Sequence, residues 1–235
     1  MINNIIPIIT CVNMSDFLSV SINYNRNKFR NYVVLTSIED ISTKSLCNKH
    51  DVDVIEYDKF FRNAKFNKSG GVNHAQRIIH KAYKNCWVLL MDADIVLGED
   101  FEEIINQTHL TNRKETTKPK DKNKLFKIER DKLKSIRPKS DSVIYGIDRY
   151  DVYEMKELFG VMSEERKYDI SHAGYFQLYF DKSKYYPNYS VDASECDLTF
   201  KHSFPRRQML ESHVFHLGRR QLHWEGRSCE KWSRI

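Results

Sequence analysis

The chain has 235 residues and a formal net charge of +6, and it is 40% hydrophobic and 30% charged, which is typical of a soluble globular protein. This length allows one domain with a substantial core. No apolar run is long enough to cross a bilayer and the N-terminus has no basic leader, so we expect a cytoplasmic protein, soluble or peripherally bound.

The positive charge is concentrated in one segment. Residues 111–139 hold twelve Lys/Arg and four Asp/Glu, a larger surplus than that of the whole chain. We therefore expect 111–139 to be a basic excursion on the surface. The five cysteines are scattered and form no CxxC pair, which argues against a disulfide framework and against a thiolate zinc site.

The first hundred residues alternate between short apolar runs and segments with helical character. The apolar runs predict strands over 5–12, 31–37, 52–57 and 86–92. The segments between and after them predict helices over 14–29, 40–50, 72–84 and 98–107. A polar loop over 58–71 precedes the third helix, for which Asn73 is the expected N-cap.

Strands that alternate with helices predict an α/β fold, in which a mostly parallel central sheet carries helices on both faces. Beyond the basic excursion, residues 142–153 and 174–181 predict two more strands, both rich in aromatic side chains. We see no internal repeat, and we expect a single domain over 1–235. Ligands of such folds bind beyond the carboxyl ends of the strands.

Two carboxylates, Asp92 and Asp94, stand at such a strand end. The residues on both sides of the pair are apolar, so an exposed turn explains it less well than a buried site, where a carboxylate needs a partner. Magnesium and manganese prefer oxygen ligands. The pair therefore predicts a metal or nucleotide site.

The same stretch, DADIV, also fits the DxDx(T/V) pattern of haloacid dehalogenase-type phosphohydrolases. In that case Asp92 would be a nucleophile toward phosphate. That pattern normally follows the first strand and is accompanied by a later GDxxxD motif. Here three strand–helix units precede it and no GDxxxD follows, so a phosphohydrolase is the second hypothesis.

Five segments, in this order, resemble glycosyltransferases of the GT-A fold that are related to family 2. They are VVLTSIEDISTKSLC (33–47), FNKSGGVNHAQ (66–76), WVLLMDADIVL (87–97), ECDLTF (195–200) and HLGRRQLHWEGR (216–227). The resemblance covers nearly the whole chain except the basic excursion. It implies a Rossmann-like GT-A domain with a nucleotide-sugar-binding half over 1–100 and an acceptor and catalytic half over 140–235.

The resemblance implies metal-dependent transfer of a sugar from a nucleotide-diphosphate donor. UDP is the first choice of nucleotide and GDP the second, and the acceptor would be a glycan, a lipid-linked molecule or a protein. Mn²⁺ or Mg²⁺ would be held by Asp92, Asp94 and His216, with His213 as the alternative histidine. Asp92 would also support the ribose.

The resemblance places further donor contacts at the early strand ends, in the glycine-containing loop and in the C-terminal tail. These residues are Thr10, Asp40, Lys68, Asn73, Trp224 and Arg227. Asp40 would read uracil, although it is equally suited to cap the following helix. Lys68 and Asn73 bracket two glycines that permit close approach to a ligand, where Lys68 would meet a phosphate.

Transfer with inversion needs a base that takes the proton of the acceptor hydroxyl. The resemblance places this base within SECDLTF, and we assign it to Asp197, with Glu195 as the alternative because Cys196 separates the two acids. Gly174 would give the acceptor room. Candidates for binding pyrophosphate or acceptor anions are Arg206, Arg207, Arg219 and Arg220.

The basic segment 111–139 also suggests a nucleic-acid-binding module, since Lys-rich runs neutralise phosphates. It lacks the interleaved aromatic residues of a single-strand binder, with Phe126 alone. We therefore expect no nucleic-acid partner. Contact with an anionic membrane surface is an alternative for this segment, and a solvated loop is the simplest interpretation.

Overall fold

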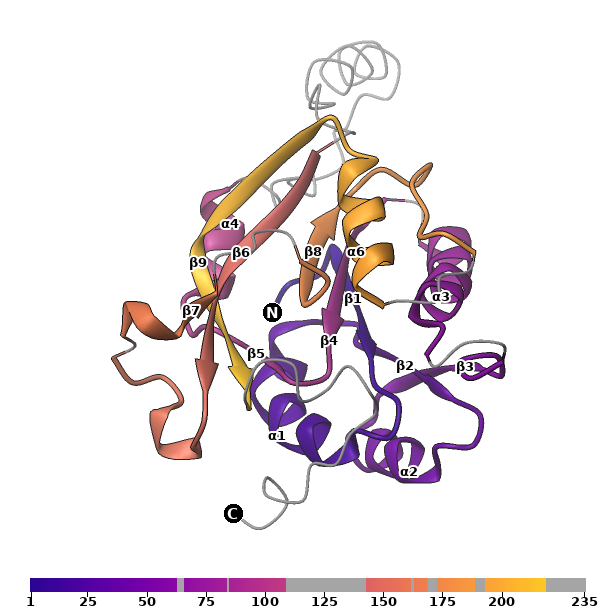
Figure 1. Cartoon of the computed structure of the whole chain (residues 1–235), viewed down its shortest axis with the longest axis horizontal. Coiled ribbons are helices and arrows are strands. Elements are labelled where there is room, and N and C mark those ends of the chain that lie inside the picture. The colour runs from indigo at the N-terminus through magenta and orange to yellow at the C-terminus, as the bar shows by residue number, and fades with distance from the viewer. Residues whose placement is uncertain are drawn as a thin grey trace, which may run out of the picture.

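The computed structural model describes residues 1–62, 66–83, 85–108, 143–161, 163–168, 173–188 and 193–218. Within these residues nine strands form one sheet in the order β3-β2-β1-β4-β8-β6-β9-β5, with β7 paired to β6 off this path (Figure 1). The strands are β1 (Ile5–Thr10), β2 (Val33–Ser37), β3 (Asp53–Tyr57), β4 (Trp87–Asp92), β5 (Ile95–Leu97), β6 (Val143–Val152), β7 (Lys167–Tyr168), β8 (Phe176–Tyr179) and β9 (Arg206–Leu217).

The α-helices are α1 (Ser15–Asn25), α2 (Ile41–Lys49), α3 (Lys68–Ala82), α4 (Phe101–Gln107) and α6 (Ala193–His202). Short 3-10 helices cover Arg26–Lys28, Met155–Glu157 and Glu164–Arg166. No helix of the described part of the chain is long and apolar enough to cross a membrane.

The first four predicted strands form the parallel part of the sheet. β1 pairs with β2 and with β4, and β2 pairs with β3, all in parallel. Every residue of β1 is buried, as expected for a parallel strand covered on both faces. This arrangement brings the carboxyl end of β4 next to that of β1, with Thr10 opposite Asp92 in the ladder.

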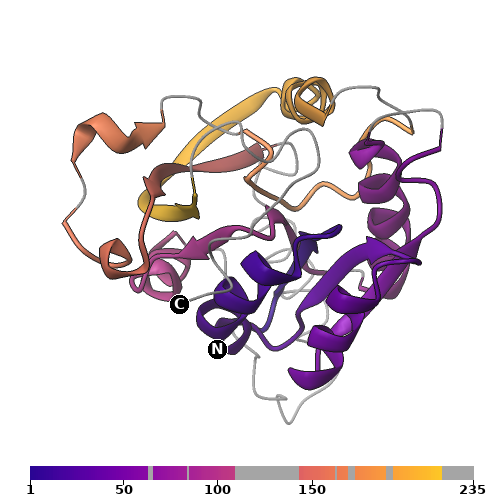
Figure 2. The ribbon, with the colours of Figure 1, turned by 60° about the horizontal axis from the view of Figure 1, so that its bottom comes forward.

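The second half of the chain extends the same sheet with mixed pairing. β8 runs antiparallel to β4 and β6, whereas β6 and β9 are parallel. β6 and β9 lie side by side, on the other side of the molecule from α3 (Figure 2). β5 crosses from the end of β4 to the edge of β9, where Ile95 pairs with His216.

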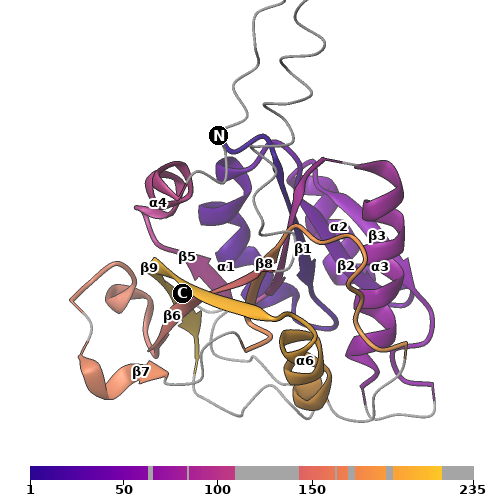
Figure 3. The same ribbon diagram turned by 90° about the horizontal axis from the view of Figure 1, so that it is seen from above.

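Helices cover both faces of the sheet (Figure 3). On one face α1, α2 and α4 contribute Leu18, Cys47 and Phe101 to a core shared with β1 and β4. On the other face α3 and α6 contribute Val72 and Phe200 to a second core. The two helix layers confirm the predicted α/β architecture.

The start of α3 corrects the prediction for the polar loop. The helix begins at Lys68 and its N-cap is Asn67, whose side chain accepts a hydrogen bond from the backbone N–H of Gly70 at 3.0 Å. Asn73 therefore lies inside the helix and is not its cap. A Cβ on Gly71 would lie 2.5 Å from the ring of Phe60, so glycine lets the first turn pack closely against the preceding segment.

Candidate active site

Asp92 ends β4 and Asp94 lies in the short turn before β5, and this turn is fixed from two sides. From α1, the Ser21 hydroxyl donates to the carbonyl of Ala93 at 2.6 Å. From β9, the backbone N–H of Leu217 donates to the carbonyl of Asp94 at 2.8 Å. The peptide groups of the turn are therefore held by elements far away in the sequence, which leaves its two carboxylates in defined directions.

Asp94 and His216 meet at this turn. The His216 Nε2 atom lies 3.2 Å from Asp94 Oδ2, and both side chains are at most 7% exposed. The His216 Nδ1 atom lies 3.0 Å from Asp151 Oδ1, and Arg149 Nη2 lies 3.1 Å from the same oxygen. Burial by itself lowers the pKa of His216, but Asp94 and Asp151 outweigh burial and raise it.

Asp92 and Asp197 share one cation, Lys68. The Lys68 ammonium donates to Asp92 Oδ1 at 2.8 Å and lies 3.4 Å from Asp197 Oδ2. Burial opposes the charge on Lys68, but Asp197 and Asp92 outweigh burial and raise its pKa, so the two carboxylates stabilise its charged form. Burial also raises the pKa of Asp92 to about 6, against the influence of Lys68, and the nearby Asp94 adds to the rise.

Asp197 lies on α6 beneath Gly174, in a space that only glycine leaves open. A Cβ on Gly174 would lie 1.7 Å from Asp197 Oδ2. The Tyr186 hydroxyl donates to Asp197 Oδ1 at 3.0 Å, and Gln177 Nε2 donates to the Asp197 carbonyl at 3.1 Å. Burial raises the pKa of Asp197, whereas Lys68 and Tyr186 lower it.

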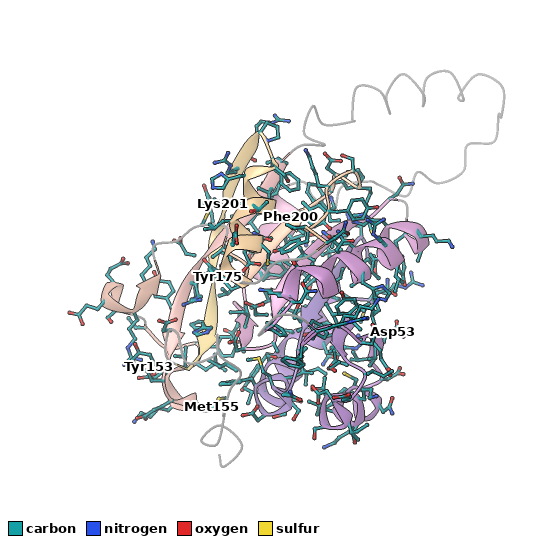
Figure 4. The ribbon with its side chains drawn as sticks, turned by 45° about the vertical axis from the view of Figure 1, so that its right-hand side comes forward. Asp53, Tyr153, Met155, Tyr175, Phe200 and Lys201 are labelled. Atoms are coloured by element: carbon teal, nitrogen blue, oxygen red, sulfur yellow. The ribbon has the colours of Figure 1, made fainter. Side chains whose placement is uncertain are left out.

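The sites predicted at positions 68, 92, 94, 197 and 216 thus come together, from α3, the β4–β5 turn, α6 and β9. Tyr175 follows Gly174, and its hydroxyl donates to the carbonyl of Ile147 on β6 at 2.7 Å. Tyr153 and Met155 lie past the C-terminal end of β6 (Figure 4). Thr10 is buried next to Asp92 in the β1–β4 ladder.

The structure places Asn73 and Asp40 in supporting roles. The Asn73 amide donates to the carbonyl of Tyr186, so it holds the segment that supplies the Asp197 hydrogen bond. Asp40 caps α2, accepting from the Thr43 backbone N–H at 3.0 Å, and it also accepts from Asn13 N–H at 2.6 Å. The capping alternative for Asp40 is confirmed, and its contact with a base remains a prediction.

Other candidates lie away from this group. Glu195 is exposed on α6, and His213 contacts the rings of Tyr150 and Phe215. Arg206 and Arg207 are exposed at the beginning of β9, whereas His216 is near its end. Four predicted residues, Arg219, Arg220, Trp224 and Arg227, lie outside the described residues, as does the segment 111–139.

Three residues of the site were missed in the sequence: Arg149, Asp151 and Tyr186. Arg149 and Asp151 are two apart on β6, so they share a face of the strand. Charged residues within an otherwise apolar strand were a visible signal, since a buried strand rarely carries them without a function. No pattern in the sequence marks Tyr186 as a site residue. Its place at the site is visible only from its packing against α3 and α6.

Asp94 and His216 are the residues suited to hold a cation. A carboxylate oxygen and an imidazole nitrogen are both ligands of manganese and related ions. No group of three or more His, Cys, Asp or Glu side chains with metal-binding geometry occurs among the residues that the structure describes. Asp92, the third predicted ligand, is directed to Lys68.

No family model matches the chain, and no curated protein sequence matches it either. Among solved structures, glucosyl-3-phosphoglycerate synthase from Mycobacterium tuberculosis, in complex with Mn²⁺, UDP-glucose and phosphoglyceric acid, is similar over 92% of this chain and 72% of that chain. Its TM-score is 0.50 at 11% identity. A second structure of that complex gives the same coverage and TM-score at 10% identity.

The fold is that of the GT-A glycosyltransferases. The position of the Asp-Ala-Asp turn at the carboxyl end of a central parallel strand agrees with the rule that ligands of open α/β sheets bind there. The GT-A fold was predicted from the order of five segments, and the structure confirms it.

Proposed function

We propose that this chain is a metal-dependent glycosyltransferase that moves a sugar from a nucleotide-diphosphate donor, UDP before GDP, to a hydroxyl acceptor. The observation that carries the proposal is the meeting of Lys68, Asp92, Asp94, Asp197 and His216 at one end of the sheet. The GT-A fold supports it, because the similar enzyme named above was solved with Mn²⁺ and UDP-glucose.

The cation would be held by Asp94 and His216, with Asp92 beside them. When bound, it would supply a Lewis acid that stabilises the charge of the departing diphosphate. Lys68 would support the same charge, since its ammonium lies at the site, 2.8 Å from Asp92 Oδ1. If a phosphate of the donor takes the place of Asp92 or Asp197 beside Lys68, the ammonium remains in an ion pair.

Asp197 is the proposed base, and it would give transfer with inversion. Its carboxylate would take the proton of the acceptor hydroxyl while that oxygen bonds to the anomeric carbon and the nucleoside diphosphate leaves. The raised pKa of Asp197 makes it a stronger base than a surface aspartate. Buried Asp197 suits this role better than exposed Glu195.

Thermal unfolding with UDP- and GDP-sugars, with and without Mn²⁺, tests the proposal. We expect stabilisation by a UDP-sugar only when Mn²⁺ is present, and its loss in Asp94→Ala. Asp53→Ala is the matched control, because Asp53 is an exposed carboxylate on the edge strand β3 (Figure 4). Stabilisation that needs no metal, or that survives in Asp94→Ala, contradicts the proposal.

The same proteins also test the phosphohydrolase hypothesis. Release of phosphate from a simple phosphomonoester, abolished in Asp92→Asn, would favour Asp92 as a nucleophile. The glycosyltransferase proposal expects no such release, because Asp92 then contributes to donor binding and forms no covalent bond with phosphate.

A further inference from the structure

His216 is held through both of its ring nitrogens. Nε2 faces Asp94 at 3.2 Å, and Nδ1 faces Asp151 at 3.0 Å on the opposite side of the ring. Asp151 is only 1% exposed. An ionised carboxylate only accepts hydrogen bonds, so each of the two favours a proton on the ring nitrogen that faces it. A cation bound by Asp94 would replace the proton on Nε2, and the Nδ1 proton would then stay with Asp151.

Asp151 is itself fixed by its surroundings. It is the register partner of His216 in the parallel β6–β9 pair. Arg149, two residues earlier on the same strand, lies 3.1 Å from the oxygen that contacts His216. The Arg149 guanidinium lies 4.9 Å from the centroid of the Tyr175 ring. A buried carboxylate is costly unless it is paired, and here a cation that stacks on an aromatic ring compensates it.

We propose that Asp151, fixed by Arg149, is a positioning residue that sets the ring orientation and tautomer of His216 for metal binding. This inference rests on the proposed function. The main chain of His216 is held independently, because β9 pairs with β5 on one side and with β6 on the other. Removing the Asp151 charge should therefore affect the ring and leave the strand in place.

The experiment measures the affinity for Mn²⁺ in the presence of UDP, from the electron paramagnetic resonance signal of free Mn²⁺. Loss of such a partner of a metal-binding histidine typically weakens metal affinity about 10–100-fold, so we expect a loss in this range for Asp151→Asn. Asp148→Asn is the matched control: Asp148 is on the same strand, 40% exposed and paired with Lys167 at 2.8 Å. Its affinity should equal that of the wild type.

A double-substitution cycle shows whether the effect passes through His216. In a His216→Ala background, Asp151→Asn should cause no further loss of Mn²⁺ affinity. An affinity of Asp151→Asn equal to that of the wild type, or an undiminished loss in the His216→Ala background, overturns the inference. If the wild type itself does not bind Mn²⁺ with UDP, the proposed function is overturned instead.

A second measurement needs no substitution at Asp151, in case Asp151→Asn does not fold. Nitrogen NMR of the wild type with Mg²⁺ and UDP reports which ring nitrogen of His216 carries the proton. The His216 signals are identified by their absence from the spectrum of His216→Ala. We expect the proton on Nδ1. A proton on Nε2 in the metal-bound protein overturns the inference.

Discussion

Replacing Gly174 with alanine would place a methyl carbon where the Asp197 carboxylate now lies. The new Cβ would be 1.7 Å from Oδ2 and 2.0 Å from Cγ, far inside van der Waals contact. Gly174 is not among the residues with positive φ, so alanine is compatible with its backbone. The carboxylate must move, and it would lose its contacts with Lys68 at 3.4 Å and Tyr186 at 3.0 Å.

The size of the effect follows from these contacts. A hydrogen bond to a charged group contributes about 1.5–3 kcal/mol, and overpacking a buried site costs about 1–3 kcal/mol. We expect Gly174→Ala to lower the free energy of unfolding by about 3 kcal/mol. For a chain of this length that corresponds to a fall in Tm of roughly 6–12 °C.

Thermal or urea unfolding of four proteins measures this effect: wild type, Gly174→Ala, Asp197→Ala and the double variant. With Asp197 shortened, the new methyl group has room, so the cost of Gly174→Ala should largely disappear in that background. Gly160→Ala is the control, because its Cβ would approach the Glu157 carbonyl no closer than 3.2 Å. A cost that persists in the Asp197→Ala background would refute the reasoning.

Three further predictions concern stability. Asp40→Ala removes the α2 cap and leaves buried hydrogen-bond donors of Thr36 and Thr43 without their carboxylate acceptor. The midpoint of urea unfolding should therefore fall by the equivalent of about 2–3 kcal/mol at an unchanged m-value. An unchanged midpoint contradicts the capping role. Burial and Lys182 lower the pKa of His80 to about 4, below its unfolded value of about 6.5. Stability should therefore be complete above pH 6.5 and fall as the pH drops toward 4, and His80→Gln should flatten this dependence when Tm is compared across the range. The pKa of Asp92 is about 6 in the folded chain and about 3.9 when unfolded, so its charge opposes folding at neutral pH. Asp92→Asn should raise the stability at pH 7.5 by about 1 kcal/mol, a value reduced for solvent screening because the side chain is 32% exposed. This gain should vanish near pH 3. A loss of stability at pH 7.5 would show that the ion pair with Lys68 dominates.

Local patterns predicted most of the first half of the fold. Apolar runs that alternate with helical segments predicted β1 to β4 and the helices between them, because hydrophobic periodicity reports which side of an element is buried. The same patterns correctly placed Asp92 and Asp94 at the end of β4, and their part in a site remains a prediction. For the later segments, the interpretation depended on the resemblance of their order to that in GT-A enzymes.

Two of the features that the sequence did not predict have signals that are not local. β5 has three residues, too few for a periodicity, and it is a strand only because β9 pairs with it. The start of α3 was missed because Gly70 and Gly71 are typical of loops, whereas close packing against Tyr57 and Phe60 keeps them helical.

The sequence by itself determined which segments are buried and which acids stand at strand ends, because both follow from the order of residues along one element. Only the tertiary structure decided how the charges pair: Lys68 with Asp92 and Asp197, and His216 with Asp94 and Asp151. Charge pairs depend on distances of a few ångströms between residues up to 129 positions apart, and no local pattern encodes such distances.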